Sequence, residues 1–161
     1  MAWIAAVRHR GPTAIILSRQ ALPEIPGTDV PYAEGLGRGG YIVKNATGKP
    51  DFMLMATGSE LSLVMEVSEA LERLGKKVRV ISIPCWSLFE QESASYRESI
   101  LGGDAIRRVS IEAGVGLGWQ KWVGPEGTII SIETFGASAP QSDLAEEFGF
   151  TVESILERLL S

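Results

Sequence analysis

The clearest candidate for binding chemistry in this sequence is an arginine that follows an apolar run. Arg19 lies in Ser18-Arg19-Gln20, directly after residues 13–17, whose continuous apolar character predicts a short buried strand. A guanidinium at a strand end offers a planar set of donors that suits a phosphate group. Arg19 is therefore a candidate ligand for a phosphorylated substrate, although an arginine at a strand end more often has a structural role.

Two glycine-rich runs have spacings that bind phosphate in other proteins. Gly35-Leu-Gly-Arg-Gly-Gly40 matches the letters of a dinucleotide fingerprint, but it follows a proline-rich stretch and precedes a strand, so it predicts a turn. Gly114-Val-Gly-Leu-Gly118 lies between a strand and a short helix, where backbone N–H groups are able to hold an anion. A tight loop without a ligand is the favoured interpretation of the second run.

A third loop, Thr57-Gly58-Ser59-Glu60, begins a helix at the end of a strand, which is where open α/β sheets bind ligands. Ser59 in this loop is expected to cap the helix. The carboxylate of Glu60 would repel an anion, so helix capping is sufficient to explain the loop.

The remaining reactive residue types are few. His9, the one histidine, has no nucleophile or carboxylate arranged beside it in the sequence and is expected on the surface. Glu112 is an acid at a strand end, and a structural role is expected for it. Cys85, the one cysteine, has no basic sequence neighbour and is expected to be an unreactive buried thiol. A single cysteine permits no internal disulfide and suits a reducing, cytoplasmic location.

The elements that must position these residues alternate between strands and helices over most of the 161 residues. This alternation predicts an α/β fold, a three-layer α/β/α arrangement around a five-stranded, mostly parallel sheet. The first strand is expected at an edge and antiparallel, forming a hairpin with the second strand because residues 45–50 are too few for a parallel crossover. Strands are expected at residues 41–43, 52–56, 78–83, 106–111 and 128–132, and helices at residues 60–74, 88–100, 119–123, 145–148 and 152–160.

The first forty residues differ in character from the rest. Residues 1–20 resemble the end of another domain, and prolines and glycines are so dense in residues 21–40 that they predict a linker. Residues 41–161 then form the main domain. An apolar strand at residues 14–17 without partner strands is expected to be mobile or to lie in an intermolecular contact, and not to pack within its own chain.

Composition excludes several classes of partner. The net charge is −5 and there is no basic block, so binding to nucleic acid is not expected. No apolar run approaches the ~18 residues that a transmembrane helix needs, and the apolar N-terminus is followed by basic residues, the reverse of a signal peptide. The sequence therefore predicts a chain that binds neither nucleic acid nor a membrane.

An ordered series of short runs resembles the transketolase family over essentially the whole chain. The longest is Gly11-Pro12-Thr13-Ala-Ile-Ile-Leu-Ser-Arg-Gln-Ala-Leu-Pro23, which is similar to the run that closes the pyrimidine-binding domain of transketolases. The other matching runs are Arg38-Gly-Gly-Tyr41, Ala56-Thr-Gly-Ser-Glu60, Tyr96-Arg-Glu-Ser99, Ile111-Glu-Ala-Gly114, Thr134-Phe-Gly-Ala-Ser-Ala-Pro140 and Glu147-Phe-Gly-Phe-Thr151.

The resemblance implies the C-terminal part of a transketolase, an enzyme that uses thiamine diphosphate and Mg²⁺ to transfer a two-carbon ketol unit between sugar phosphates. Residues 1–20 would then be the remnant of the pyrimidine-binding domain, and Arg19 would contact the phosphate of the sugar. The motifs that hold the cofactor and metal, and the catalytic residues, belong to the two earlier domains of the family. This chain is therefore expected to bind no cofactor or metal, to contribute no catalytic residue and to be inactive by itself.

The resemblance also implies partners. The N-terminal portion of a transketolase, in the same or a separate chain, is expected to complete the enzyme, which would be a homodimer with this domain in a structural, dimer-supporting role. Two alternatives stay open. One is a related thiamine enzyme, such as a 2-oxoacid dehydrogenase β chain or a deoxyxylulose-phosphate synthase. The other is a stand-alone regulatory module that binds a small anion near residues 57–60 and 114–119.

Overall fold

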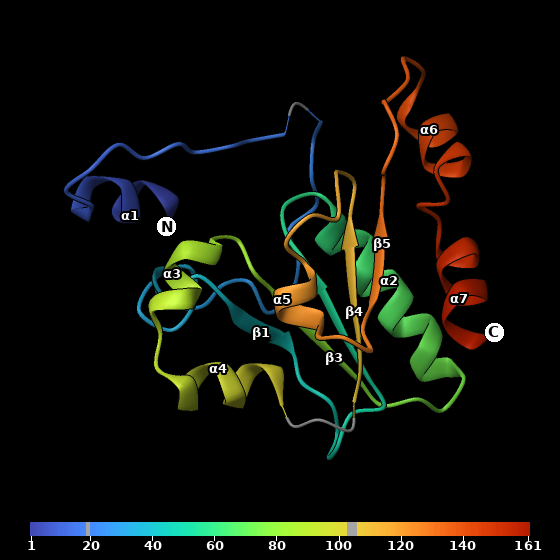
Figure 1. Cartoon of the computed structure of the whole chain (residues 1–161), viewed down its shortest axis with the longest axis horizontal. Helices are drawn as coiled ribbons and strands as arrows, with labels where there is room; N and C mark the ends of the chain where they lie inside the picture. Colours follow the sequence, from blue (N-terminus) through green and yellow to red (C-terminus); the bar gives the residue numbers. More distant parts are fainter. Residues whose placement is uncertain (19, 103–105) are drawn as a thin grey trace.

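Five strands form one mixed sheet in the order β1-β3-β2-β4-β5 (Figure 1). The computed structural model describes residues 1–18, 20–102 and 106–161. The pairings β2–β3, β2–β4 and β4–β5 are parallel, and only β1 pairs antiparallel, at an edge. The predicted sheet is therefore confirmed. The strands are β1 (Tyr41–Lys44), β2 (Phe52–Ala56), β3 (Val78–Ser82), β4 (Arg107–Glu112) and β5 (Thr128–Ser131).

The predicted hairpin between the first two strands is wrong. β1 pairs with β3, with Tyr41 opposite Ser82, and β3 lies between β1 and β2. The distance from β1 past β3 to β2 is only about 10 Å. Residues 45–51, which connect β1 to β2, are long enough to cover it. Strand β2 is buried along its whole length, so it takes a central place between two parallel neighbours, while the less buried β1 takes the edge.

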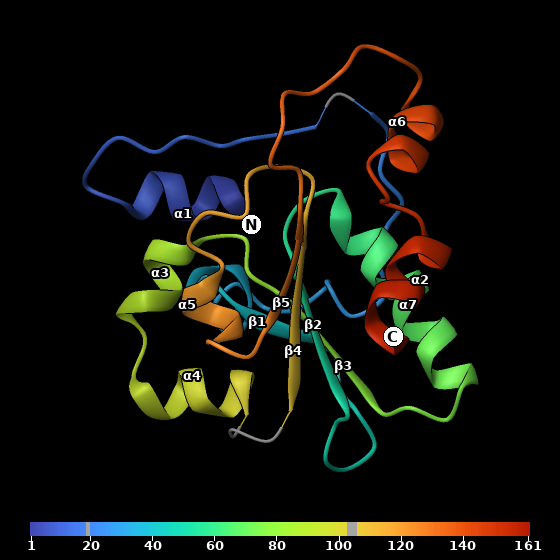
Figure 2. The same ribbon diagram turned by 45° about the vertical axis from the view of Figure 1, so that its right-hand side comes forward.

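Two apolar cores lie on opposite faces of the sheet, and β2 contributes to both. Phe52, Leu54 and Ala56 pack with helices α2 and α7, whereas Met53 and Met55 pack with α3, α4 and α5. The alternation follows from the pleat of the strand and explains why the segment is continuously apolar. Figure 2 shows the two helical layers on either side of the sheet. The helices are α1 (Ala2–Arg8), α2 (Glu60–Arg73), α3 (Trp86–Gln91), α4 (Ala94–Leu101), α5 (Gln120–Val123), α6 (Gln141–Glu147) and α7 (Val152–Leu160), with a short 3₁₀ helix η1 (Leu36–Arg38).

The helices depart from the sequence predictions in three places. The helix predicted over residues 145–148 is α6, which begins four residues earlier, at Gln141. The predicted helix over residues 88–100 is two helices, because Glu92 adopts an extended conformation that ends α3, and Ser93 then caps α4. Ser59 precedes α2 as expected, but its hydroxyl donates to the Glu60 carboxylate and does not cap the helix. In α7, by contrast, the Thr151 hydroxyl accepts a hydrogen bond from the Ser154 N–H. This bond pairs one of the backbone N–H groups of the first turn that have no partner within the helix.

The N-terminal segment does not form the predicted strand. After α1 the described residues up to Ser18 have no regular structure, and Ile16 and Leu17 are 92% and 79% exposed. A strand needs a neighbour to satisfy its backbone, and no described segment of the sheet offers one. As expected, the apolar segment does not pack within its own chain. None of the described helices is long and apolar enough to cross a membrane.

Candidate functional site

Three loops gather at the end of the sheet where the parallel strands finish. They follow β2, β4 and β5 and include residues 57–59, 113–119 and 132–140. Residues 1–18 lie toward the same end of the molecule in both views (Figures 1 and 2). The next stretch, around Leu22 and Ile25, encloses a small cavity of about 170 Å³ with Ser59 at the start of α2. This end of the sheet therefore combines the sequence-predicted loops with the segment that carries Arg19.

Arg19 itself lies outside the described residues. Its neighbours Ser18 and Gln20 are both exposed. Its role in binding a phosphate therefore stays a prediction.

The glycine-rich loop after β4 binds a carboxylate of its own chain. The backbone N–H of Gly116 donates to Glu133 Oε1 at 2.9 Å, and the Ser131 hydroxyl donates to the same oxygen at 2.6 Å. These two hydrogen bonds hold the pKa of Glu133 below its ordinary value, the Ser131 bond contributing most. A side chain at Gly116 would lie 2.7 Å from Ser131 Oγ and 2.9 Å from Glu133 Oε1, so it would displace the two side chains that make this arrangement.

Sequence reasoning missed Glu133, because nothing local connects it to a glycine 17 residues earlier. Only the parallel pairing of β4 with β5 brings the two loops together. The anion that the sequence predicted as a possible ligand of residues 114–118 is thus supplied by the protein at Gly116.

Two further carboxylates, Glu112 and Glu60, lie close enough together to interact. Glu112 ends β4, and burial raises the pKa of its carboxyl, with a further increase from the nearby Glu60. A hydrogen bond from Trp119 opposes these two effects. Because these two acids lie beside residues 57–60 and 114–119, that region disfavours the small anion considered above.

The other reactive residues are placed as follows. His9 is exposed, as expected, and its Nδ1 lies 3.2 Å from the Thr13 hydroxyl. Cys85 is half-exposed and not buried as predicted, because it lies at the start of α3 with its sulfur 3.4 Å from the Ser87 hydroxyl. Among the residues that the structure describes, no group of three or more His, Cys, Asp or Glu side chains is placed to hold a metal ion.

Two of the short runs noted in the sequence meet at the junction between the linker and the sheet. Gly35–Gly40 contains η1 and turns into β1, which confirms the predicted turn. The Arg38 guanidinium pairs with Glu92 at 2.6 Å and covers the Tyr96 ring at 3.3 Å, while the Tyr96 hydroxyl donates to the Gly40 carbonyl. These contacts fasten the end of the linker to α3 and α4, so this part of the linker has a structural role.

Comparisons with known proteins agree with this architecture. The family described as "Transketolase-like TK C-terminal domain" matches residues 39–151. The chloroplastic transketolase of Solanum tuberosum is 46% identical over 155 residues, covering 95% of this chain and 20% of the relative. The chain therefore spans about a fifth of the length of that relative.

Solved structures show the same relationship. The transketolase from Leishmania mexicana has a TM-score of 0.87 and 34% identity, covering 98% of this chain and 22% of that chain. A structure titled "Split gene transketolase, inactive beta4 tetramer" has a TM-score of 0.63 and 21% identity, covering 86% of this chain and 46% of that one. The second similarity shows the shared fold alone.

Proposed function

Because the chain belongs to the transketolase-like C-terminal domain family, we propose that it is the C-terminal portion of a transketolase that works together with the N-terminal portion. The two portions are either one polypeptide or two chains. The structure titled as a split gene transketolase makes the second arrangement a realistic one to test. As one polypeptide the complete enzyme is a homodimer, and as two chains it is a dimer of such pairs. In either case it transfers a two-carbon ketol unit between sugar phosphates in the cytoplasm.

One observation carries this proposal: large apolar side chains lie in solvent at the end of the sheet where the loops gather. Phe135 and Leu117, in loops after β5 and β4, are 99% and 82% exposed, and Ile16 in the N-terminal segment is 92% exposed. Each exposed group of this size forgoes about 1.5–3 kcal/mol of burial free energy. A surface of this kind is expected to be covered by another protein segment, and the N-terminal portion of the enzyme is the partner proposed here.

The residues described here do not fit a thiamine diphosphate or Mg²⁺ site. No group of three or more His, Cys, Asp or Glu side chains among them is placed to hold a metal ion, the backbone N–H of Gly116 is bonded to Glu133, and Glu60 and Glu112 make the adjacent loops acidic. We therefore assign the cofactor and metal to the N-terminal portion. The role of this chain is to fix the position of Arg19 and to support the assembled dimer, with no catalytic residue of its own.

Arg19 is the substrate-binding residue in this proposal. Its guanidinium would donate two parallel hydrogen bonds to the phosphate of the sugar. These bonds would orient the sugar, but Arg19 would take no part in the chemical step. The phosphate is remote from the reacting carbons, so its binding energy serves to position them.

The experiment that tests the proposal is a ketol-transfer assay with thiamine diphosphate and Mg²⁺. The chain is assayed alone and after mixing with a separately expressed N-terminal portion. Activity is expected only in the mixture. In that mixture, Arg19→Gln is expected to raise the KM for a phosphorylated acceptor at least about tenfold. The KM for a non-phosphorylated acceptor is expected to stay the same. Activity of the chain alone, or a mixture that stays inactive although the two portions associate, would contradict the proposal.

A further inference from the structure

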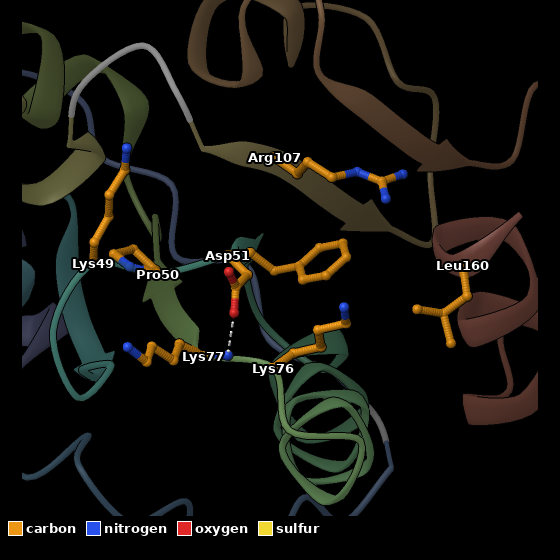
Figure 3. A pocket seen from close by; sticks show the side chains of 8 residues that line it. Lys49, Pro50, Asp51, Lys76, Lys77, Arg107 and Leu160 are labelled. Carbon is orange, nitrogen blue, oxygen red and sulfur yellow. Dashed lines mark hydrogen bonds between the residues drawn. The ribbon is translucent and has the colours of Figure 1, made fainter.

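A basic cavity opens at the opposite end of the sheet from the loops described above. It has a volume of about 610 Å³ and is lined by the beginnings of β2 and β4, the turn before β3 and the end of α7 (Figure 3). Small-molecule sites commonly enclose about 300–1,000 Å³. The cavity is therefore large enough for a phosphorylated sugar or a similar metabolite.

The charge of this cavity is opposite to that of the whole chain. Its lining contains Lys49, Lys76, Lys77 and Arg107 but only one acid, Asp51, whereas the chain carries a net charge of −5. Asp51 is already bonded, because its Oδ2 accepts the backbone N–H of Lys77 at 2.7 Å. The cavity thus concentrates positive charge on an acidic protein, which raises the local concentration of anions.

These cations are available to a ligand. Among the described residues the ion pairs are Arg38–Glu92, Lys44–Glu72 and Lys121–Glu90, and none of them involves a residue of the cavity.

The Arg107 guanidinium lies over the Phe52 ring, 5.0 Å from its centre. Attraction between a guanidinium and a ring uses none of the N–H groups as hydrogen-bond donors. The ring therefore holds Arg107 in place without using its hydrogen-bonding capacity.

Figure 3 shows that Lys76 and Arg107 extend on the same side of the cavity, toward Leu160, while Lys49 and Lys77 extend to the other side. Lys76 comes from the turn after α2 and Arg107 from the beginning of β4, so two separate elements direct cations toward one space. A guanidinium and an ammonium that share a space in this way match the oxygens of a phosphate group.

We propose that this cavity binds the phosphate group of a small phosphorylated metabolite. The Arg107 guanidinium and the Lys76 ammonium donate to the phosphate oxygens, and Lys49 and Lys77 add attraction at longer range. Asp51, whose other carboxylate oxygen remains able to accept, receives a hydroxyl of the attached carbon chain.

This site is separate from the substrate position proposed for Arg19. The cavity lies where the parallel strands begin, whereas the segment that leads to Arg19 lies toward the end where they finish. A ligand here does not react; it occupies a second site on the same domain. The inference does not depend on the proposed function, because the cavity belongs entirely to this chain.

The test is an NMR titration of the isotopically labelled full chain with fructose 6-phosphate as the probe at low ionic strength. The expected result is saturable shifts of the amides of Phe52, Lys77 and Arg107. Fructose without the phosphate is expected to give no shift, and inorganic phosphate is expected to give the same pattern more weakly. The binding is expected to weaken as salt rises, because the four cations are exposed to solvent.

Variants decide whether the named residues hold the phosphate. Arg107→Gln and Lys76→Gln are each expected to weaken binding about tenfold, as the loss of one charge-assisted hydrogen bond implies. Arg10→Gln removes the same charge from the exposed N-terminal segment and is the matched control, expected to leave binding unchanged. Absent shifts at the cavity amides, equal binding of unphosphorylated fructose, or an equal effect of Arg10→Gln would overturn the proposal.

Discussion

Glu112 shows how one partly buried acid near these loops responds to pH. Burial raises the pKa of its carboxyl and Glu60 raises it further, so the folded chain binds this proton more tightly than the unfolded chain does. A group of this kind stabilises the fold at low pH, and that contribution is lost as pH rises from the unfolded pKa through the folded pKa. Ionisation of Glu112 therefore makes the domain less stable.

We expect Glu112→Gln to remove this dependence. A neutral amide imitates the protonated acid, so the variant does not lose stability as the parent does when Glu112 ionises. The free energy of unfolding of the variant minus that of the parent should therefore rise between about pH 4 and pH 7. The gain should be about 0.5 kcal/mol or less because the group is partly solvated. Urea unfolding at several pH values measures this difference in the free energy of unfolding. Glu126→Gln, at an exposed residue, is the control. A difference between variant and parent that falls as pH rises would contradict the raised pKa of Glu112.

The role of Glu133 could not be predicted from its own place in the sequence. The sequence predicted that the glycine-rich loop after β4 has the donors for an anion, and the loop does donate to a carboxylate oxygen. It could not predict that Glu133 would be that anion, because the pairing of β4 with β5 determines which side chain reaches Gly116.

Among the elements, the junction between the linker and β1 depends on a glycine. Gly39 has a φ of +76°, and a side chain there would lie 2.3 Å from both the Cys85 carbonyl oxygen and the Phe89 backbone nitrogen. The same segment supplies the Gly39 carbonyl that accepts the Cys85 N–H. The linker is therefore packed tightly against the beginning of α3.

Gly39→Ala is expected to destabilise the domain by about 3 kcal/mol or more, since backbone atoms cannot move aside as a flexible side chain can. Gly58→Ala is the matched control, because Gly58 also has a positive φ, of +58°, but has open space around it. It should cost only the conformational penalty of about 1 kcal/mol. Equal losses for the two variants in urea unfolding would show that the clash with α3 is unimportant.

The element boundaries were predictable where the pattern is local. Helix α7 begins and ends at the predicted residues, since the Thr151 cap and the regular spacing of its apolar residues are contained in one segment. The interruption between α3 and α4 was missed because both helices contribute side chains to one core, so the apolar pattern continues across it.

At the scale of the whole molecule, the exposed apolar side chains support the proposed association with an N-terminal portion. Phe135 is 99% exposed and lies in the loop after β5, within a run that resembles the transketolase family. A residue that packs only within its own domain would not be placed in solvent, so we expect it to become buried when the N-terminal portion binds.

Phe135→Ser is expected to weaken binding of the N-terminal portion at least about tenfold, from the lost burial of one aromatic side chain. Leu74→Ser, at an apolar residue that is 57% exposed just after α2, serves as the control and should bind normally. Calorimetric titration of the two portions gives both values. Equal affinities for the two variants would place the contact elsewhere on the chain.

The sequence by itself determined the α/β class, the segments that form the sheet, the antiparallel edge strand and the family, because these depend on local periodicity and on short runs of residues. Tertiary structure alone decided that β3 separates β1 from β2, that Glu133 bonds to Gly116 and that Lys76 and Arg107 share a cavity. The reason is physical: each of these contacts joins residues distant in the chain, and it exists only once the order of the strands is set.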